Sequence, residues 1–344
     1  MSHVRTVLGD IDPVELGVTL VHEHLLSDLR GLFDEPTDHQ LREFAYAPLS
    51  MEIAGWVRLN YTRNVHNMVL NDPEEMAGEV SRYMDAGGRS IVELSGIGVG
   101  RDPDGLARIS TETGAHIVMG TGWYIEPLQP PDIATLDEGR LAERLVSDIQ
   151  TGSDGGSVRA GILGEFGCSW PLTDVERKVL RAGGRAQAVT GAAMTIHPGR
   201  NAAAPYEILD AVAAGGGDVT RTVIDHVDRT IFDTDELLRL AQTGCYIEYD
   251  LFGNETSHYP FAPIDMPNDG TRIDAIMELF AAGHGKQVLV SHDFAFRTCL
   301  RGYGGYGYAH MLDNVVPKMR SKGMSKDDVD TLLIGNPGRL LALD

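Results

Sequence analysis

Short apolar runs alternate with helical segments along this chain, and the alternation repeats eight times within its 344 residues. Strands that alternate with helices predict a parallel sheet, and eight units of this size predict a (β/α)8 barrel, the TIM-barrel fold of the α/β class. We expect the strands at 17–22, 90–95, 116–121, 159–165, 192–197, 221–226, 244–250 and 287–293.

The helix signals support this interpretation. A short helix is expected at about 103–113, ended by Gly114. Asp72 is placed to cap a helix, with Pro73 at its first position and Glu75 completing a capping box. The alternative is an open doubly wound sheet. Such a sheet usually carries a glycine-rich phosphate-binding turn after its first strand, whereas here residues 22–26 read His-Glu-His-Leu-Leu. The barrel is therefore the favoured fold.

The chain shows no break in composition that would mark a second domain. We therefore expect a single barrel domain over residues 1–344, with a short lead-in that forms a hairpin at 1–16. A polar segment at about 27–60, after the first strand, is too long for an ordinary connection. We expect it to be a loop insertion, and its aromatic residues suit a substrate wall.

Composition narrows the list of partners. The formal net charge is −21, and such a surface repels nucleic acid and anionic membranes, so we expect neither as a partner. The three cysteines are too sparse for a disulfide framework. No signal-peptide pattern is visible at the N-terminus, and no apolar run approaches a membrane span. We expect a cytoplasmic protein.

Residues that bind metals stand at the ends of the expected strands. His22 and His24 are two apart in an extended run, so both side chains point to the same side, and Glu23 points away. The carboxyl ends of the strands of a barrel converge at one mouth. The candidate ligands that this geometry brings together are His22, His24, Glu165, His197, His226 and Asp293.

The chemistry of these side chains indicates a transition metal. Four imidazoles and two carboxylates suit Zn2+, with Mn2+, Co2+ or Fe2+ as alternatives. Six ligands are too many for one tetrahedral zinc with an open position. They suit two divalent ions that share a bridging carboxylate, which is a common hydrolytic arrangement. We therefore expect a binuclear metal centre.

The motifs around these residues resemble those of the phosphotriesterase-like branch of the amidohydrolase superfamily, over nearly the whole chain. They are Val21-His-Glu-His-Leu25, Gly120-Thr-Gly-Trp-Tyr124, Gly164-Glu-Phe-Gly167, Ile196-His197, Asp225-His226 and Val290-Ser-His-Asp293. The resemblance implies that His22, His24 and Asp293 hold a buried metal ion, and that His197 and His226 hold a more exposed one. It also implies that Asp293 accepts a proton as a hydroxide bridging the metals attacks the substrate.

The bridging position departs from the better-known phosphotriesterases, which carry a carboxylated lysine there. No lysine lies at the end of the fourth strand, and Glu165 takes that place. The chain is therefore similar to the phosphotriesterase-related subgroup that bridges its metals with glutamate. The five lysines are Lys178, Lys286, Lys318, Lys322 and Lys326.

Two further residues are expected near the substrate. The resemblance places Tyr124 beside the exposed metal ion. Arg297 follows Asp293 by four residues, in the loop over the mouth, and could pair with a carboxylate, sulfonate or phosphate of the substrate. Asp250 ends the seventh strand and is a candidate hydrogen-bond partner for a metal-binding histidine.

We expect a metal-dependent hydrolase that acts on a small-molecule carboxylic ester, lactone or amide, with phosphotriester cleavage as a main or side activity. The alternative is a metal-containing protein that binds a small molecule with little or no turnover. The resemblance also implies a homodimer.

Overall fold

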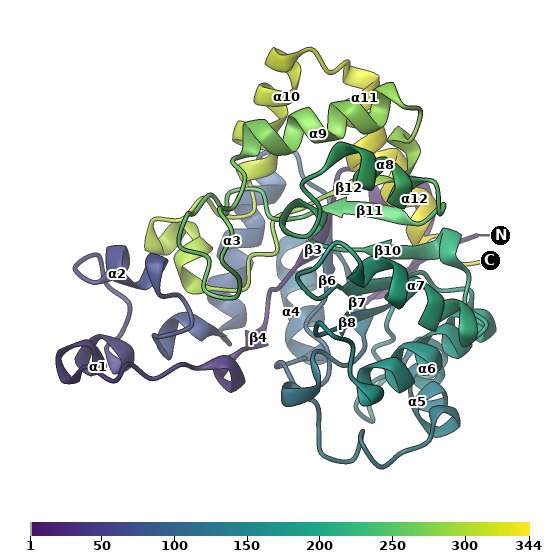
Figure 1. The fold of residues 1–344 in the computed structure, drawn as a ribbon, viewed down its shortest axis with the longest axis horizontal. Coiled ribbons are helices and arrows are strands. Elements are labelled where there is room, and N and C mark those ends of the chain that lie inside the picture. Colours follow the sequence, from purple (N-terminus) through teal and green to yellow (C-terminus); the bar gives the residue numbers. More distant parts are fainter. Residues whose placement is uncertain (1) are drawn as a thin grey trace.

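A parallel eight-stranded sheet lies at the centre of the computed structural model, which describes residues 2–344 (Figure 1). The strands neighbour one another in chain order, from β3 to β12. Their bounds are β3 Thr19–Glu23, β6 Ser90–Glu93, β7 His116–Thr121, β8 Ile162–Gly167, β9 Met194–His197, β10 Thr222–Ile224, β11 Tyr246–Tyr249 and β12 Val288–Val290.

The first and last strands of the sheet meet, which nearly closes it into a barrel. The Asp293 amide donates to the His22 carbonyl at 3.1 Å, and the His22 amide donates to Ser291 Oγ at 3.0 Å. A sheet whose strands follow chain order and whose edges meet is a barrel rather than a doubly wound sheet. The predicted (β/α)8 fold is confirmed.

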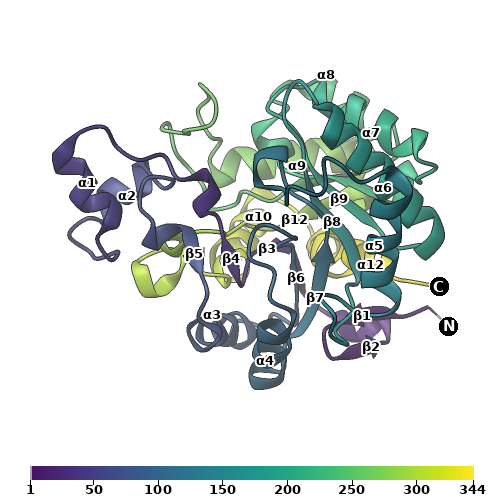
Figure 2. The ribbon, with the colours of Figure 1, turned by 90° about the horizontal axis from the view of Figure 1, so that it is seen from below.

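Helices connect the strands and surround the barrel (Figures 1 and 2). The helix predicted at 103–113 forms at those residues, because Asp102 caps its start and Gly114 ends it in the left-handed conformation. The helices that lie between consecutive strands of the sheet and surround the barrel are α3 Pro73–Asp85, α4 Pro103–Thr113, α5 Glu138–Gln150, α6 Asp174–Thr190, α7 Ala204–Ala214, α8 Thr234–Ala241 and α9 Asp269–Ala281.

The segment after β3 contains more regular structure than a loop. It forms α1 (His39–Tyr46) and α2 (Ala54–Leu59), which project to one side of the barrel in both views (Figures 1 and 2). The short strands β4 (Ser27–Asp28) and β5 (Val69–Leu70) pair antiparallel where this segment leaves and rejoins the barrel.

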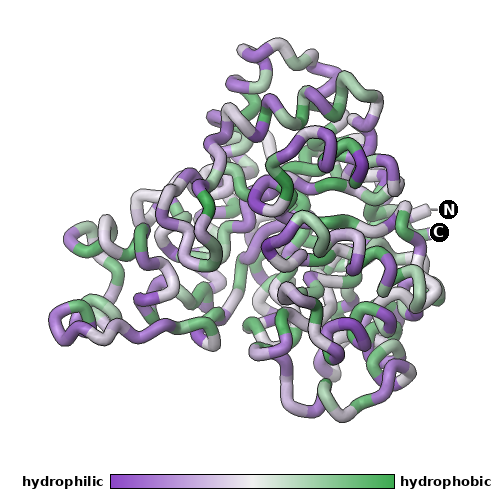
Figure 3. Tube along the Cα trace, in the orientation of Figure 1, coloured by the Kyte–Doolittle hydropathy of each residue, from purple (hydrophilic) through white to green (hydrophobic). Residues whose placement is uncertain are grey.

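Two apolar layers stabilise the barrel, and the strands at its centre are mostly apolar along the trace (Figure 3). Val21, Val92, Val118, Ile162 and Leu289 fill the interior from different strands. A larger layer packs the helices against the outer face. Because the interior is filled, ligands can bind only at the ends of the barrel.

Both termini lie at the end of the barrel opposite the predicted site. The predicted hairpin forms from β1 (Val4–Thr6) and β2 (Gly9–Ile11), and the His3 amide donates to the Leu343 carbonyl at 2.8 Å. The C-terminal segment contains α10 Val316–Lys322, α11 Lys326–Asp330 and α12 Asn336–Leu341. Within residues 2–344, none of the helices combines the length and apolar character needed to cross a membrane.

Candidate metal centre and active-site cavity

Strand β3 delivers two imidazoles to the mouth of the barrel. His22 is fully buried near the end of β3, and His24 follows directly after the strand. Glu23 points the other way, where its Oε1 lies 2.7 Å from Nδ1 of His292 and accepts from the Ser291 hydroxyl at 2.7 Å. This alternation is the one that an extended strand requires.

Glu165 lies within β8 and faces three imidazoles with one oxygen. Its Oε1 is 3.0 Å from Nδ1 of His197, 3.2 Å from Nε2 of His226 and 3.9 Å from Nε2 of His22. Its side chain is only 3% exposed. A single carboxylate at the centre of three histidines is placed as a bridge would be.

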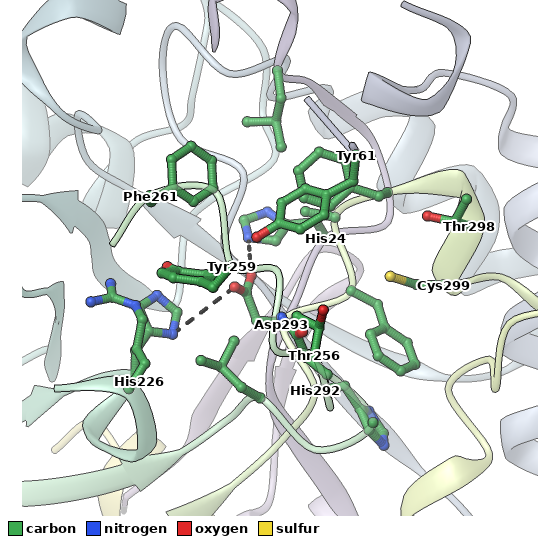
Figure 4. Close-up of a pocket in the computed structure, with 18 of the residues that line it drawn as sticks. His24, Tyr61, His226, Thr256, Tyr259, Phe261, His292, Asp293, Thr298 and Cys299 are labelled. Atoms are coloured by element: carbon green, nitrogen blue, oxygen red, sulfur yellow. Dashed lines mark ion pairs between the residues drawn. The ribbon is translucent and has the colours of Figure 1, made fainter. Parts of the chain in front are cut away.

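Asp293 lies between His24 and His226 and forms ion pairs with both (Figure 4). Its Oδ1 is 3.0 Å from Nε2 of His24 and 3.6 Å from Nε2 of His22, and its Oδ2 is 4.0 Å from Nδ1 of His226. The side chain is 23% exposed, so it also faces the cavity. Asp293 thus contacts the buried cluster and the space above it.

The strands end earlier than the sequence predicts at two of these positions. His226 and Asp293 lie beyond β10 and β12, and both adopt the left-handed backbone conformation, with φ of 48° and 52°. Residues other than glycine seldom adopt it, and such residues gather at functional sites.

The cluster fits transition-metal ions. His22 Nε2 has no hydrogen-bond partner among residues 2–344, although two carboxylate oxygens lie within 4 Å of it. Zinc binds nitrogen and oxygen at about 2.0–2.2 Å, so ligand atoms around one ion lie roughly 3–3.5 Å apart. Three groups of side chains could each hold a metal ion, and all three include His22. They are His22 with His24 and Asp293, His22 with Glu165, Asp225 and His226, and His22 with Asp225, Glu248 and Asp250.

The Asp250 carboxylate contacts Nδ1 of two histidines of the cluster. Its Oδ1 is 2.8 Å from Nδ1 of His226, and its Oδ2 is 3.0 Å from Nδ1 of His22. It lies directly after β11 and is fully buried. A carboxylate on the far nitrogen of a metal-binding histidine fixes the ring and its tautomer.

Burial and neighbouring charges shift the pKa values of the cluster in both directions. Against the effect of burial, neighbouring carboxylates raise the pKa of His22, His24 and His226. Burial raises the pKa of the Glu165 carboxyl, but His197 and His22 outweigh burial and hold it well below the usual value. Burial, followed by the charge of Arg229, holds the pKa of His197 well below its usual range. Glu165 is therefore ionised and His197 neutral, which are the forms that bind metals.

A cavity of about 620 Å³ opens above the cluster. His24, Glu165, His197, His226 and Asp293 lie at its floor. The walls come from the segment before β5, the loop after β11 and the loop after β12, and Figure 4 shows the aromatic side chains among them. The apolar and aromatic wall residues include Leu29, Leu32, Leu59, Tyr61, Phe261 and Phe296.

The two residues predicted near the substrate have different positions. Tyr124 lines the cavity, and its hydroxyl lies 3.1 Å from Nδ1 of His197. Arg297 is not among the cavity-lining residues. Its guanidinium forms an ion pair with Glu75 and donates to the His66 carbonyl at 3.0 Å. In this structure Arg297 is therefore engaged elsewhere and does not face a substrate.

Two arginines that were not predicted to lie near the substrate do line the cavity. Arg200 follows His197 by three residues, and Arg229 follows His226 by three. The repeated His-x-x-Arg spacing at two neighbouring strand ends was visible in the sequence. Such spacing predicts that the two arginines lie near His197 and His226.

Comparisons with known proteins identify the family of the chain. Residues 2–341 match the model of the phosphotriesterase family. The human N-acetyltaurine hydrolase is 42% identical over 340 residues, which cover 98% of this chain and 97% of the human one. A resiniferatoxin-binding protein from Rhodobacter sphaeroides superimposes with a TM-score of 0.95 at 36% identity, covering 98% of this chain and 94% of the other. A lactonase from Listeria monocytogenes gives 0.79 at 25% identity, with both chains fully covered.

The predicted resemblance is confirmed, because the family model covers nearly the whole chain and relatives of similar length are named hydrolases. The names of these relatives also identify the chain as an enzyme rather than a binding protein without turnover. The chain belongs to the phosphotriesterase family and is a hydrolase that acts on a small molecule.

Proposed function

We propose that this protein is a metal-dependent amide hydrolase that cleaves N-acetyltaurine or a close relative of it, an acyl group on a short aminosulfonate. The single observation that carries the reaction type is the position of Glu165, whose Oε1 faces His22, His197 and His226 within 3.9 Å. The substrate is suggested by relatives about 40% identical over almost their full length, which are named N-acetyltaurine hydrolase.

Two divalent ions are part of this proposal, with Zn2+ as the first candidate and Mn2+, Co2+ or Fe2+ as alternatives. His22, His24 and Asp293 would hold one ion, His197 and His226 the other, and Glu165 would bridge them. The ligand roles of these six residues stay predictions. When bound, such ions polarise a carbonyl group and lower the pKa of water.

The residues of the chain supply the remaining steps. Water adds to the acyl carbon, the bond between that carbon and the amide nitrogen breaks, and the amine leaves with one proton. Asp293 is placed to hold that proton, because its carboxylate faces the cavity and contacts His24 at 3.0 Å. Tyr124 also lines the cavity, and its phenol can donate a hydrogen bond to the acyl oxygen.

Lactone hydrolysis is the second candidate function, favoured by the full-length likeness to the Listeria lactonase. Lactones and acetamides have the same reacting centre, an acyl carbon that water attacks. They differ in the group that leaves and in what the cavity must bind beyond it.

The test measures taurine release from N-acetyltaurine by purified protein supplied with Zn2+ or Mn2+. We expect turnover that is lost after chelation, restored by the metal, and lost in Glu165→Gln. Glu112→Gln, an exposed carboxylate on α4, is the matched control and keeps its activity. Turnover of a lactone panel without any release of taurine would select the second candidate instead.

A further inference from the structure

A buried arginine without an acidic partner lines the cavity. Of the four buried arginines of residues 2–344, three form ion pairs with aspartate or glutamate. Arg229 is only 3% exposed, and no carboxylate oxygen of the described residues lies within 4.0 Å of its guanidinium. A buried charge without a counter-charge is costly. An anion bound in the cavity would compensate the charge of Arg229. The four buried arginines are Arg5, Arg229, Arg272 and Arg297.

The protein groups that Arg229 does contact are all neutral. Its guanidinium donates to the Pro198 carbonyl at 3.2 Å and to Thr230 Oγ1 at 3.3 Å, and Nη2 lies 3.0 Å from Nε2 of His197. These contacts fix the plane of the guanidinium beside the catalytic cluster. None of these contacts neutralises the positive charge of Arg229.

A second arginine, Arg200, lines the same cavity from the neighbouring strand end. Its Nε donates to the Tyr259 hydroxyl at 2.9 Å, and its guanidinium carbon lies 4.8 Å from the centre of the Phe261 ring. It also has no carboxylate oxygen within 4.0 Å among residues 2–344. Aromatic rings hold an arginine without neutralising it, so its terminal nitrogens stay available to a ligand.

The chain brings these two charges to one side of the cavity. Arg200 follows His197 after β9, and Arg229 follows His226 after β10, and these two strands are paired in the sheet. The protein as a whole carries a large formal net charge of −21. Two unpaired guanidiniums beside the reacting centre are therefore a local exception, suited to an oxyanion.

We infer that Arg200 and Arg229 form the subsite for the anionic end of the substrate, a sulfonate separated from the scissile amide by a short chain. The inference rests on the proposed function and deepens it. Guanidinium groups bind oxyanions with paired hydrogen bonds, which orient the ligand as well as attract it. A neutral amide would leave both charges unpaired and would be a poorer substrate than an anionic one.

Steady-state kinetics on two substrates tests the subsite. The variants are Arg200→Met and Arg229→Met, and the substrates are N-acetyltaurine and the neutral ester p-nitrophenyl acetate. We expect kcat/KM for N-acetyltaurine to fall about 10- to 100-fold, mainly through KM, while the neutral ester is hydrolysed as before. Arg108→Met is the matched control, because Arg108 is exposed on α4 and keeps both activities.

Equal losses on both substrates would overturn the inference, because the arginines would then only support the neighbouring histidines. If Arg229→Met does not fold, the half-buried Arg200 carries the test, and Arg229→Lys retains the charge without the paired hydrogen bonds.

Direct binding separates this inference from the proposed function. Calorimetry with ethanesulfonate should show binding to the wild-type protein that the Arg200→Met variant loses. Such binding without any turnover of N-acetyltaurine would retain the subsite and refute the proposed function. Turnover of N-acetyltaurine that the arginine variants leave unchanged would refute the subsite alone. Hydrolysis of a neutral N-acetyl amine as fast as N-acetyltaurine would also refute the subsite.

Discussion

Asp250 accepts a 2.8 Å hydrogen bond from Nδ1 of His226, at the far side of the ring from Glu165. Its second oxygen lies 3.0 Å from Nδ1 of His22, so one buried carboxylate orients an imidazole in each half of the predicted centre. Both rings then direct Nε2 toward the cluster. This geometry gives Asp250 a positioning role, because it acts only through the two histidines.

We expect Asp250→Asn to weaken metal binding by roughly 10- to 100-fold, because a neutral amide orients the two imidazoles less firmly than the carboxylate does. Metal content after dialysis against a graded chelator measures this. Asp235→Asn, an exposed carboxylate on α8, should bind metal as the wild-type protein does. Unchanged affinity in Asp250→Asn would show that the two rings are held by other contacts.

We expect Glu165→Gln to lose about half of the bound metal and to lower turnover by on the order of 100-fold or more, the cost of misplacing reacting groups. An amide offers one oxygen and no charge, so it bridges two cations poorly. Elemental analysis of the purified variant gives the metal content. Full metal content together with full activity would contradict the bridging role of Glu165.

Arg272→Met should destabilise the fold by about 3–5 kcal/mol, because it leaves the Asp228 carboxylate buried without a partner. Arg272 Nε lies 2.7 Å from Asp228 Oδ2, and both side chains are fully buried. Thermal unfolding measures the loss. Arg140→Met, which removes an exposed ion pair with Glu143, should change stability by only about 0.5 kcal/mol.

Glu93 makes stability fall with rising pH. Burial raises the pKa of this carboxyl from 4.5 to about 7. The folded protein therefore binds the proton more tightly than the unfolded chain, and stability is lost as pH rises from about 4.5 through about 7. The loss amounts to about 3 kcal/mol by pH 8.

Glu93→Gln should flatten that dependence, since the amide does not titrate. Urea unfolding at pH 5 and pH 8 measures the change in the free energy of unfolding. The exposed Glu112→Gln should retain the wild-type slope. A Glu93→Gln slope equal to that of the wild-type protein would show that other groups produce the dependence.

Much of the fold and of the candidate site follows from the sequence alone. The helix at 103–113 and the strand at 116–121 form where they were predicted. His22 and His24 lie on one side because side chains alternate along a strand, and chain order in a barrel brings distant strand ends to one mouth. These are local periodicities and a rule of topology, which need no knowledge of side-chain packing.

The tertiary structure decided which arginines are free of acidic partners at the cavity. Arg297 is paired with Glu75, more than 200 residues away in the chain, whereas Arg229 is buried with no acidic partner among residues 2–344. The tertiary structure also turned part of the expected loop at 27–60 into α1 and α2. A strand end can be inferred from its own residues, but whether a charge is neutralised depends on contacts that only the folded chain makes.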